Sequence, residues 1–526
     1  MWKPQAAPVE KYMFLLACLL CGIPIWLPQF PPMADLPQHA AQVALLLNLG
    51  KPEFPFAELF HLNLFTPYLL GYGLIAAFTP LLGIVAACKL VIWLALAAFA
   101  ISTRFLLREA GADPYWAWLT FPVLYGFTYQ WGLLIFLIAA PIGLMFLALV
   151  WRMKAKPDLR SSLVIMLMLF ALFFCHALIL GFFSLIALVY WLFSVKRLRD
   201  FIKCAWPMAA IAPLIVFWFA LAANHPLTNF PVGWDISWFR TADYYYSNIA
   251  AWADQAYPGW GRINGFIPRL LGTRPQLVFT LLGLFLLALP FLSGGRISKS
   301  RVRLIPVLVI ALTLLLLPTF LFGNMYTFQR FTYLAMPLYL MMIDSPVAAG
   351  GVVGWAQRYL RLLAPAIAFG WIGYMSINAL QFNKDMDGFD TILAKMEPGK
   401  RSLSLVFARD DNHSIAPAFL HFPSWYSALG SGITDPSFAV TYVQPVIYKP
   451  EHVPKAKFEG FEWNPQWFDW QKHEGSQYDY FVVRAPVNMA AYLFRTAPCT
   501  IALTAQAGQW WLYRKDPYCQ SEPAPK

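Results

Sequence analysis

The stretch GLLIFLIAAPIGLMFLALVW, residues 132–151, contains no charged side chain. As a helix it would be about 30 Å long, which matches the hydrocarbon core of a bilayer. A cluster of basic residues follows it: Arg152, Lys154, Lys156 and Arg160. Because such clusters flank membrane spans on the cytoplasmic side, this stretch predicts a transmembrane helix that ends in the cytoplasm.

Apolar runs of this kind fill most of the chain. Among its 526 residues, 59% are hydrophobic and 13% are charged, and the mean hydropathy is +0.54, outside the usage of soluble globular proteins. We expect a polytopic α-helical membrane protein with about eleven transmembrane helices. The predicted spans cover residues 12–27, 84–102, 116–129, 132–151, 162–176, 177–194, 205–223, 276–293, 304–322, 330–348 and 362–381. The net charge of +12 does not predict nucleic-acid binding, because the basic residues fall in short clusters between apolar runs.

The apolar run from Pro67 to Leu82 is interrupted by prolines and glycines, and we interpret it as an interfacial or re-entrant helix. With this interpretation every short basic cluster falls on the cytoplasmic side, as the positive-inside rule requires. The N-terminus is then cytoplasmic as well. Counting the run as a full span would place the later basic clusters outside.

Two segments on the outer side, residues 28–64 and 224–276, are too long to be simple connectors, and long loops in compact domains are usually functional. Beyond Gln381 the composition becomes mixed and charged. Strand-like patterns occur there at residues 403–407, 480–483, 500–504 and 510–513. We therefore predict a transmembrane module over residues 1–381 and a soluble α/β domain over residues 382–526, outside the cytoplasm.

The seven cysteines fall into two groups. Five lie in or beside predicted spans and are interpreted as small apolar residues: Cys18, Cys21, Cys88, Cys175 and Cys204. Cys499 and Cys519 instead flank a predicted hairpin that turns near Gly508, which would bring them close together. A disulfide between them would suit an oxidising compartment, but the sequence alone does not fix the register that it needs.

Residues 31–41, PPMADLPQHAA, carry the chemistry of the first outer loop. Asp35 is the first acidic residue after the first predicted span, and Pro37 favours a helix that begins beside it. We expect residues 39–48 to form an apolar-rich helix on the outer membrane surface. Asp35 is then either a functional carboxylate or an ordinary N-cap, and His39 is either a functional side chain or a solvated surface residue.

This loop and the overall organisation resemble the GT-C superfamily of membrane glycosyltransferases. The chain is most similar to the bacterial branch with Asp-x-Pro-x-His in the first loop, matched by Asp35, Pro37 and His39. The segments YDYFVV at 478–483 and GQWWLYR at 508–514 are also similar. Leu36 stands where lipid A aminoarabinose transferases and protein mannosyltransferases commonly carry Glu, which argues against a close match to their substrates.

The resemblance implies a GT-C-like transferase that moves a sugar from a polyprenyl-phosphate donor to a hydroxyl or amine at the outer membrane face, usually with inversion. Asp35 would be the general base that takes the acceptor proton, and His39 would orient that carboxylate or bind the sugar. The partners would be the lipid-linked donor, membrane lipids and a glycan, lipid or protein acceptor of the cell envelope. The implied location is the bacterial inner membrane, with the C-terminal domain in the periplasm.

The departing polyprenyl phosphate needs a cation at the outer face. Arg330 is the best candidate because it begins the outer end of a predicted span, where an arginine is costly unless it is used. The alternative is that it snorkels to lipid headgroups. Further candidate substrate-binding residues are Tyr326, Gln329, Arg240, Arg262 and His176. Neither a metal-ligand pattern nor a nucleotide-sugar fingerprint is apparent, so no metal site and no cofactor is assigned.

Other classes of protein remain as alternatives. A transporter should show two related halves and ionisable residues at mid-membrane depth, but we find no internal repeat and only Lys89 and Asp344 as clear charges within spans. A polysaccharide polymerase or ligase that uses undecaprenyl-linked sugars explains Asp35 and the C-terminal domain less well. A noncatalytic relative with the same fold is a further alternative, and only an activity assay would distinguish it from an active transferase.

Overall fold

The computed structural model describes residues 8–153, 157–227, 260–317, 319, 325–346, 350–458 and 460–516. They divide into two compact units. The helical unit comprises the chain up to Leu27 and Leu90–Asn378, and the mixed unit comprises Pro28–Lys89 and the chain from Ala379 onward. The division between Asn378 and Ala379 lies close to the predicted domain boundary at 381/382, but the first outer loop groups with the C-terminal part of the chain.

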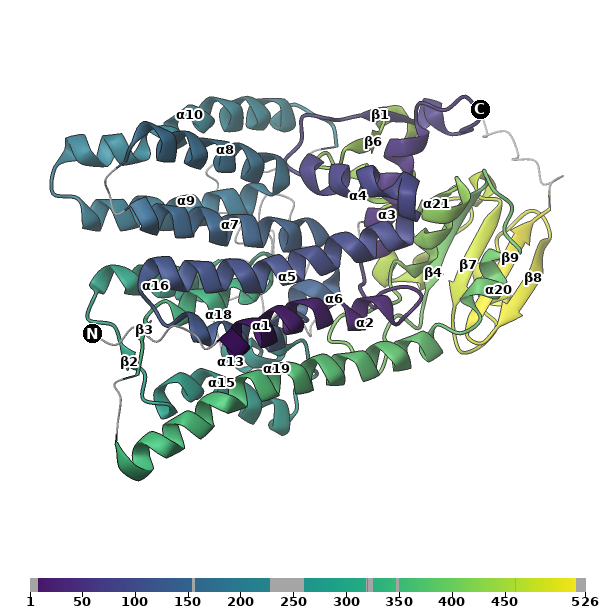
Figure 1. Ribbon diagram of the computed structural model, residues 1–526. Coiled ribbons are helices and arrows are strands. Elements are labelled where there is room, and N and C mark those ends of the chain that lie inside the picture. Colours follow the sequence, from purple (N-terminus) through teal and green to yellow (C-terminus); the bar gives the residue numbers. More distant parts are fainter. Residues whose placement is uncertain are drawn as a thin grey trace. The chain divides into compact units, whose positions relative to one another are not determined.

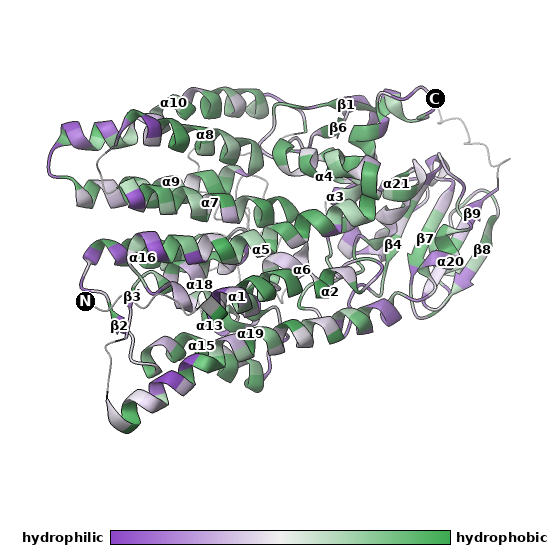
Figure 2. Ribbon diagram, in the orientation of Figure 1, coloured by the Kyte–Doolittle hydropathy of each residue, from purple (hydrophilic) through white to green (hydrophobic). Residues whose placement is uncertain are grey.

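Helices make up nearly all of the helical unit. Its elements are α1 (Pro8–Leu20), α2 (Ile23–Trp26), α5 (Ile84–Ala110), η2 (Pro114–Val123), α6 (Phe127–Trp131), α7 (Leu134–Met153), α8 (Leu159–Cys175), α9 (Ala177–Ser194), α10 (Leu198–Ala223), α13 (Trp260–Asn264), α14 (Phe266–Leu271), α15 (Leu277–Leu292), β2 (Arg296–Ile297), η3 (Arg301–Leu304), α16 (Ile305–Leu316), α17 (Thr327–Arg330), α18 (Thr332–Leu340), β3 (Ile343–Asp344) and α19 (Gly351–Asp385). α5 begins in the mixed unit and α19 ends there. Within the helical unit α7, α8, α9 and α10 run side by side (Figure 1). Figure 2 shows that hydrophobic residues dominate these helices, while hydrophilic residues gather near their ends.

Six helices among the described residues are long and apolar enough to cross a membrane. They are Val9–Trp26, Ile84–Ala110, Leu134–Met153, Ala177–Ser194, Leu198–Ala223 and Gly351–Asp385. Each overlaps a predicted span, and the shorter apolar helices α8 and α15 overlap two more. The predicted class, a mostly helical chain with several apolar helices, is thereby confirmed, whereas the count of eleven is not.

The predicted span at residues 116–129 is wrong. A 3-10 helix, η2, ends there and the short helix α6 begins after Gly126, whose backbone is extended. Pro122 lacks the N–H donor that a continuous α-helix needs, and a Cβ at Gly126 would lie 2.7 Å from the carbonyl oxygen of Leu270. Residues 116–131 are all buried, so this irregular backbone is shielded by protein.

A single span over residues 330–348 is also wrong, because α17, α18 and the short strand β3 share that region. β3 pairs with β2 in an antiparallel ladder. The carboxylate of Asp344 in β3 forms an ion pair with Arg303, whose side chain is 6% exposed. Asp344 is therefore a strand residue with a buried partner, not a charge within a spanning helix.

The mixed unit contains a five-stranded sheet. Its elements are α3 (Leu36–Asn48), η1 (Ala57–Leu59), β1 (Phe60–Leu62), α4 (Leu69–Leu82), α20 (Phe389–Leu393), β4 (Arg401–Val406), η4 (Phe422–Ser424), α21 (Trp425–Gly430), β5 (Ile433–Asp435), η5 (Phe438–Val440), β6 (Val446–Tyr448), η6 (Pro450–His452), η7 (Phe461–Trp463), η8 (Pro465–Trp467), η9 (Gly475–Gln477), β7 (Tyr480–Arg484), α22 (Ala490–Leu493), β8 (Ile501–Ala507) and β9 (Trp510–Lys515). The strand order is β5-β4-β7-β9-β8, with β4 parallel to β5 and β7, and β9 antiparallel to β7 and β8. β4, β7, β8 and β9 coincide with the predicted strands, and Gly508 turns the β8–β9 hairpin with φ +56°.

The first outer loop is part of the same folded unit. β1 pairs with β6 in antiparallel register, and an apolar cluster of buried side chains joins the two chain regions: Leu45, Phe54, Phe60, Ile433, Ala439, Val446 and Tyr448. α3 begins beside Pro37 as predicted, but its residues 36–45 are all buried. The prediction that this helix lies on the membrane surface is therefore wrong, because α3 is a core element of the mixed unit.

Candidate functional site

Asp35 is the N-cap residue of α3, yet its side chain makes no capping hydrogen bond. Its Oδ1 instead lies 2.9 Å from Nδ1 of His421, the residue before η4. Asp35 is 8% exposed and His421 is 7% exposed. The interpretation of Asp35 as an ordinary N-cap is therefore wrong, because its carboxylate is used in a long-range contact with a buried imidazole.

The contact with Asp35 determines which ring nitrogen of His421 donates a hydrogen bond. Its Nδ1 carries a proton, because the carboxylate oxygen of Asp35 can only accept a hydrogen bond. Nε2 is buried and has no hydrogen-bond partner among the described residues. The rings of Phe438 and Phe458 meet the imidazole nearly perpendicularly, with centroid distances of 5.8 and 5.5 Å. Aromatic side chains therefore enclose the imidazole.

Glu462 in η7 adds a second carboxyl group to this region. Burial raises the pKa of Glu462 to about 8, and the negative charge of Asp35 acts in the same direction. The Oε2 atom of Glu462 is buried and has no hydrogen-bond partner among the described residues. Glu462 therefore keeps its proton near neutral pH.

His39, one turn further along α3, is 5% exposed. Its Nδ1 lies 2.6 Å from the hydroxyl oxygen of Tyr72, which donates its own proton to Oε1 of Gln444 at 2.5 Å. Because a tyrosine hydroxyl has one proton, Nδ1 of His39 is the donor to Tyr72. The interpretation of His39 as a solvated surface residue is wrong, and its proposed contact with substrate stays a prediction.

The loop between β5 and η5 holds the first turn of α3. Nε2 of Gln38 donates to the carbonyl oxygen of Pro436 at 2.6 Å, and Oε1 of Gln38 accepts from the backbone N–H of Phe438 at 3.0 Å. The ring of Phe438 also contacts His39, at a centroid distance of 5.3 Å. One loop therefore fixes both the N-terminal turn of α3 and the aromatic neighbour of His421.

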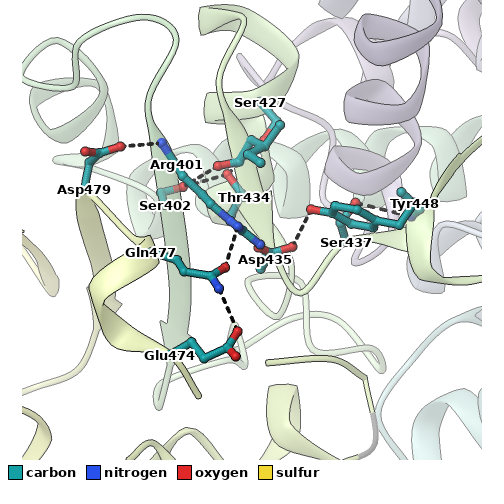
Figure 3. A network of polar contacts seen from close by, with 12 residues as sticks. Arg401, Ser402, Ser427, Thr434, Asp435, Ser437, Tyr448, Glu474, Gln477 and Asp479 are labelled. Carbon is teal, nitrogen blue, oxygen red and sulfur yellow. Dashed lines mark hydrogen bonds and ion pairs between the residues drawn. The ribbon is translucent and has the colours of Figure 1, made fainter. Parts of the chain in front are cut away.

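That loop is anchored to the sheet through Asp435, which is fully buried (Figure 3). The guanidinium of Arg401 on β4 donates to Oδ2 of Asp435 at 3.0 and 2.8 Å. The hydroxyl of Tyr448 on β6 donates to Oδ1 at 3.0 Å. Asp435 directly precedes the loop. The ion pair with Arg401 therefore fixes the loop, and with it the first turn of α3, relative to the sheet.

The second set of candidate residues lies in the helical unit. Arg330 ends α17 and is 5% exposed, which does not fit the snorkelling alternative. Its Nη1 lies 3.4 Å from Nε2 of His176, and Nη2 donates to the carbonyl oxygen of Met325. His176 is 2% exposed, and its Nδ1 accepts from the backbone N–H of Leu178 at 3.3 Å at the start of α9. Arg330 and His176 are thus brought together.

Tyr326 and Gln329 lie next to Arg330 in the chain and are also buried. Tyr326 adopts the left-handed conformation, with φ +56°, and its ring contacts Trp131 at a centroid distance of 4.1 Å. Gln329 is 1% exposed, and neither its amide nitrogen nor its amide oxygen has a hydrogen-bond partner among the described residues. A buried amide of this kind costs about 1 to 3 kcal/mol unless water or a ligand satisfies it.

The remaining predicted residues have other surroundings. Nη1 of Arg262 donates to the carbonyl oxygens of Leu314 and Leu317 at 3.1 and 2.7 Å, which satisfies the end of α16. Arg240 lies outside the described residues, as does most of the second outer loop.

Cys499 is disulfide-bonded, and its predicted partner Cys519 lies outside the described residues, so the pairing stays a prediction. Over the part of the chain that the structure covers, no group of three or more His, Cys, Asp or Glu side chains could hold a metal ion.

Two solved structures share this fold. ArnT from Cupriavidus metallidurans bound to undecaprenyl phosphate is 11% identical, with a TM-score of 0.58 over 98% of this chain and 100% of that chain. The apo state of that ArnT is 10% identical, with a TM-score of 0.54 over 97% and 98%. ArnT is a membrane glycosyltransferase of the GT-C family, so the resemblance inferred from the sequence is confirmed at the level of the fold. No family model and no curated protein matches the sequence.

Proposed function

We propose that this chain is a glycosyltransferase of the bacterial inner membrane that moves a sugar from a polyprenyl-phosphate donor to an acceptor at the outer face. The observation that carries the proposal is the Asp35 carboxylate, which is buried, not used as a helix cap and paired with His421. The fold shared with ArnT supports a lipid-linked donor, since one ArnT structure holds undecaprenyl phosphate.

In the proposed reaction Asp35 is the general base. Its carboxylate accepts the proton of the acceptor hydroxyl or amine while the acceptor oxygen or nitrogen attacks the anomeric carbon. The bond between that carbon and the phosphate oxygen breaks, and polyprenyl phosphate leaves with the bonding electrons. Attack opposite to the leaving group inverts the configuration of the sugar. His39, one turn along α3 from Asp35, is the candidate for a contact with the sugar.

The leaving phosphate gains negative charge and needs a fixed cation. Arg330 is the candidate, because its guanidinium is buried and forms a planar fork that suits phosphate oxygens. Gln329, whose amide has no partner among the described residues, supplies a neutral donor and acceptor beside it in the chain. Tyr326 and His176 are the candidates for holding this arginine in place.

The proposal is tested by comparing the cell envelope of a deletion strain with that of a strain complemented with the intact gene. Mass spectrometry of surface glycans, lipid A and glycoproteins should show one sugar missing from the deletion strain and restored by the gene. The purified protein in nanodiscs, given a lipid-linked sugar pool from the same membranes as donor and the envelope fraction of the deletion strain as acceptor, should release polyprenyl phosphate. An unchanged envelope together with no release would contradict the proposal.

The orientation is tested by labelling single introduced cysteines with a membrane-impermeant reagent. Positions Ser161 and Lys196, which flank basic clusters, should be protected in intact spheroplasts, and Lys472 in the C-terminal region should react. The reverse pattern would place Asp35 on the cytoplasmic side and would remove the proposed access to an outer acceptor.

A further inference from the structure

His421 has no assigned role in the proposed reaction, although it is the side chain that contacts the proposed base. We propose that His421 is a positioning residue for Asp35: its Nδ1–H holds Oδ1 of the carboxylate and leaves Oδ2 as the oxygen that accepts the acceptor proton. This inference rests on the proposed function, because it concerns the same proton transfer.

The two ends of the pair differ in accessibility. Oδ1 of Asp35 is occupied by His421, while no hydrogen bond to Oδ2 is found among the described residues, and the Asp35 side chain keeps 11% of its surface exposed. Nε2 of His421 is buried. An acceptor group therefore reaches Oδ2 of Asp35 more readily than it reaches the imidazole, so the carboxylate is the base and the imidazole is its support.

The start of α3 explains why Asp35 needs such support. An N-cap aspartate usually accepts from the backbone N–H of the second or third helical residue. Pro37 occupies the second position and has no N–H, so only the N–H of Gln38 remains for a normal cap. Nδ1–H of His421 supplies the missing donor and turns the carboxylate away from the helix, toward the rest of the mixed unit.

The imidazole is itself held in place by packing. Phe438 and Phe458 contact its ring, and Gln38 fixes the backbone of Phe438. The orientation of His421 is therefore set by the same turn of α3 whose N-cap carboxylate it holds. This reciprocal arrangement restricts Asp35 to one direction, which is the requirement for a base that must meet a proton at a fixed place.

The proposal predicts how His421 variants behave. His421→Phe removes the donor, and loss of a hydrogen bond to a charged group should lower transfer roughly 10- to 100-fold. His421→Asn places an amide N–H near the position of Nδ1 and should recover most of the rate.

The experiment uses the full-length protein in nanodiscs, with polyprenyl-phosphate-linked sugars extracted from the source membrane as donor and the envelope fraction of a deletion strain as acceptor. The rate of transfer is measured for the wild type, His421→Phe, His421→Asn and the exposed control His452→Asn. Undecaprenyl phosphate binding and thermal unfolding report whether each variant is folded.

Loss of rate in His421→Phe, with recovery in His421→Asn, would support the proposal. Two results would overturn it: wild-type behaviour of both variants, or equal loss in both while each still binds undecaprenyl phosphate. If His421→Phe fails to fold, His421→Leu, which also lacks the donor, replaces it and should show the same loss of rate. Absence of transfer in the wild type would instead reject the proposed function, so the two failures are distinguishable.

Discussion

Replacing Asp35 by Asn should nearly abolish transfer in a protein that still folds. The amide keeps the shape of the carboxylate, and its oxygen can still accept from Nδ1–H of His421 at the observed 2.9 Å. It cannot accept a proton from the acceptor, and general bases contribute about 10² to 10⁴ in rate. We therefore expect transfer to fall by about that factor.

The stability of this variant follows from the same geometry. Asp35 makes no side-chain capping bond, so none is lost, and Asn and Asp cap comparably well in any case. A charge-assisted hydrogen bond becomes a neutral one, which should cost about 1 kcal/mol. The folded protein should accordingly appear in the membrane at near wild-type level.

The assay measures initial rates of sugar transfer in nanodiscs, together with undecaprenyl phosphate binding and thermal unfolding. Asp410→Asn, at an exposed position in the same unit, is the matched control and should transfer at the wild-type rate. Wild-type activity in Asp35→Asn would show that the carboxylate is not the base. Loss of activity together with loss of binding would show that Asp35 acts in assembly of the site instead.

Variants at three further positions test other parts of the structure. Arg330→Ala should weaken binding of undecaprenyl phosphate, and Arg330→Lys should restore the charge but not the planar fork; equal affinity in all three proteins would remove Arg330 from the donor site. Asp435→Asn should destabilise the protein by about 3 to 5 kcal/mol in chemical unfolding, because it leaves the Arg401 charge without its buried partner. Glu462→Gln should gain stability over the wild type as pH rises from 4.5 to about 8: the folded protein holds the Glu462 proton more tightly than the unfolded chain, so wild-type stability falls through that window. A difference in melting temperature that does not change with pH would contradict this assignment.

The first turn of α3 could be predicted from the sequence because its signals are local. Pro37 sets the start of the helix, and Asp35 and His39 lie within one turn of it. The environment of this helix could not be predicted in the same way. An apolar helix after a membrane span has the same composition whether lipid or protein covers it. The burial of residues 36–45 and the contacts of Leu45 with the C-terminal part of the chain show that protein covers it.

His421 and Glu462 carry no local signal. His421 stands in a stretch without strand or helix periodicity, and Glu462 belongs to a three-residue 3-10 helix. Their importance comes from contacts across the sequence, which a single sequence does not encode in any short motif. The nearest hint was the spacing of aromatic residues around them, and that pattern is more often an ordinary core.

The failed span at residues 116–129 has a different cause. Hydropathy measures only whether a segment can be surrounded by apolar groups, and this segment satisfies that test in either conformation. The choice between helix and irregular backbone was made by Pro122 and Gly126 together with the close approach of Leu270. The conformation at Gly126 depends on Leu270, 144 residues further along the chain, and hydropathy contains no information about such a neighbour.

The two members of the Asp35–His421 pair are 386 residues apart in the chain. At a synthesis rate of about 5 to 20 residues per second, His421 emerges from the ribosome roughly 20 to 80 s after Asp35. During that interval α3 lacks the C-terminal residues that cover it in the folded protein. A chain that stops before residue 421 therefore carries the Asp35 carboxylate without its imidazole partner.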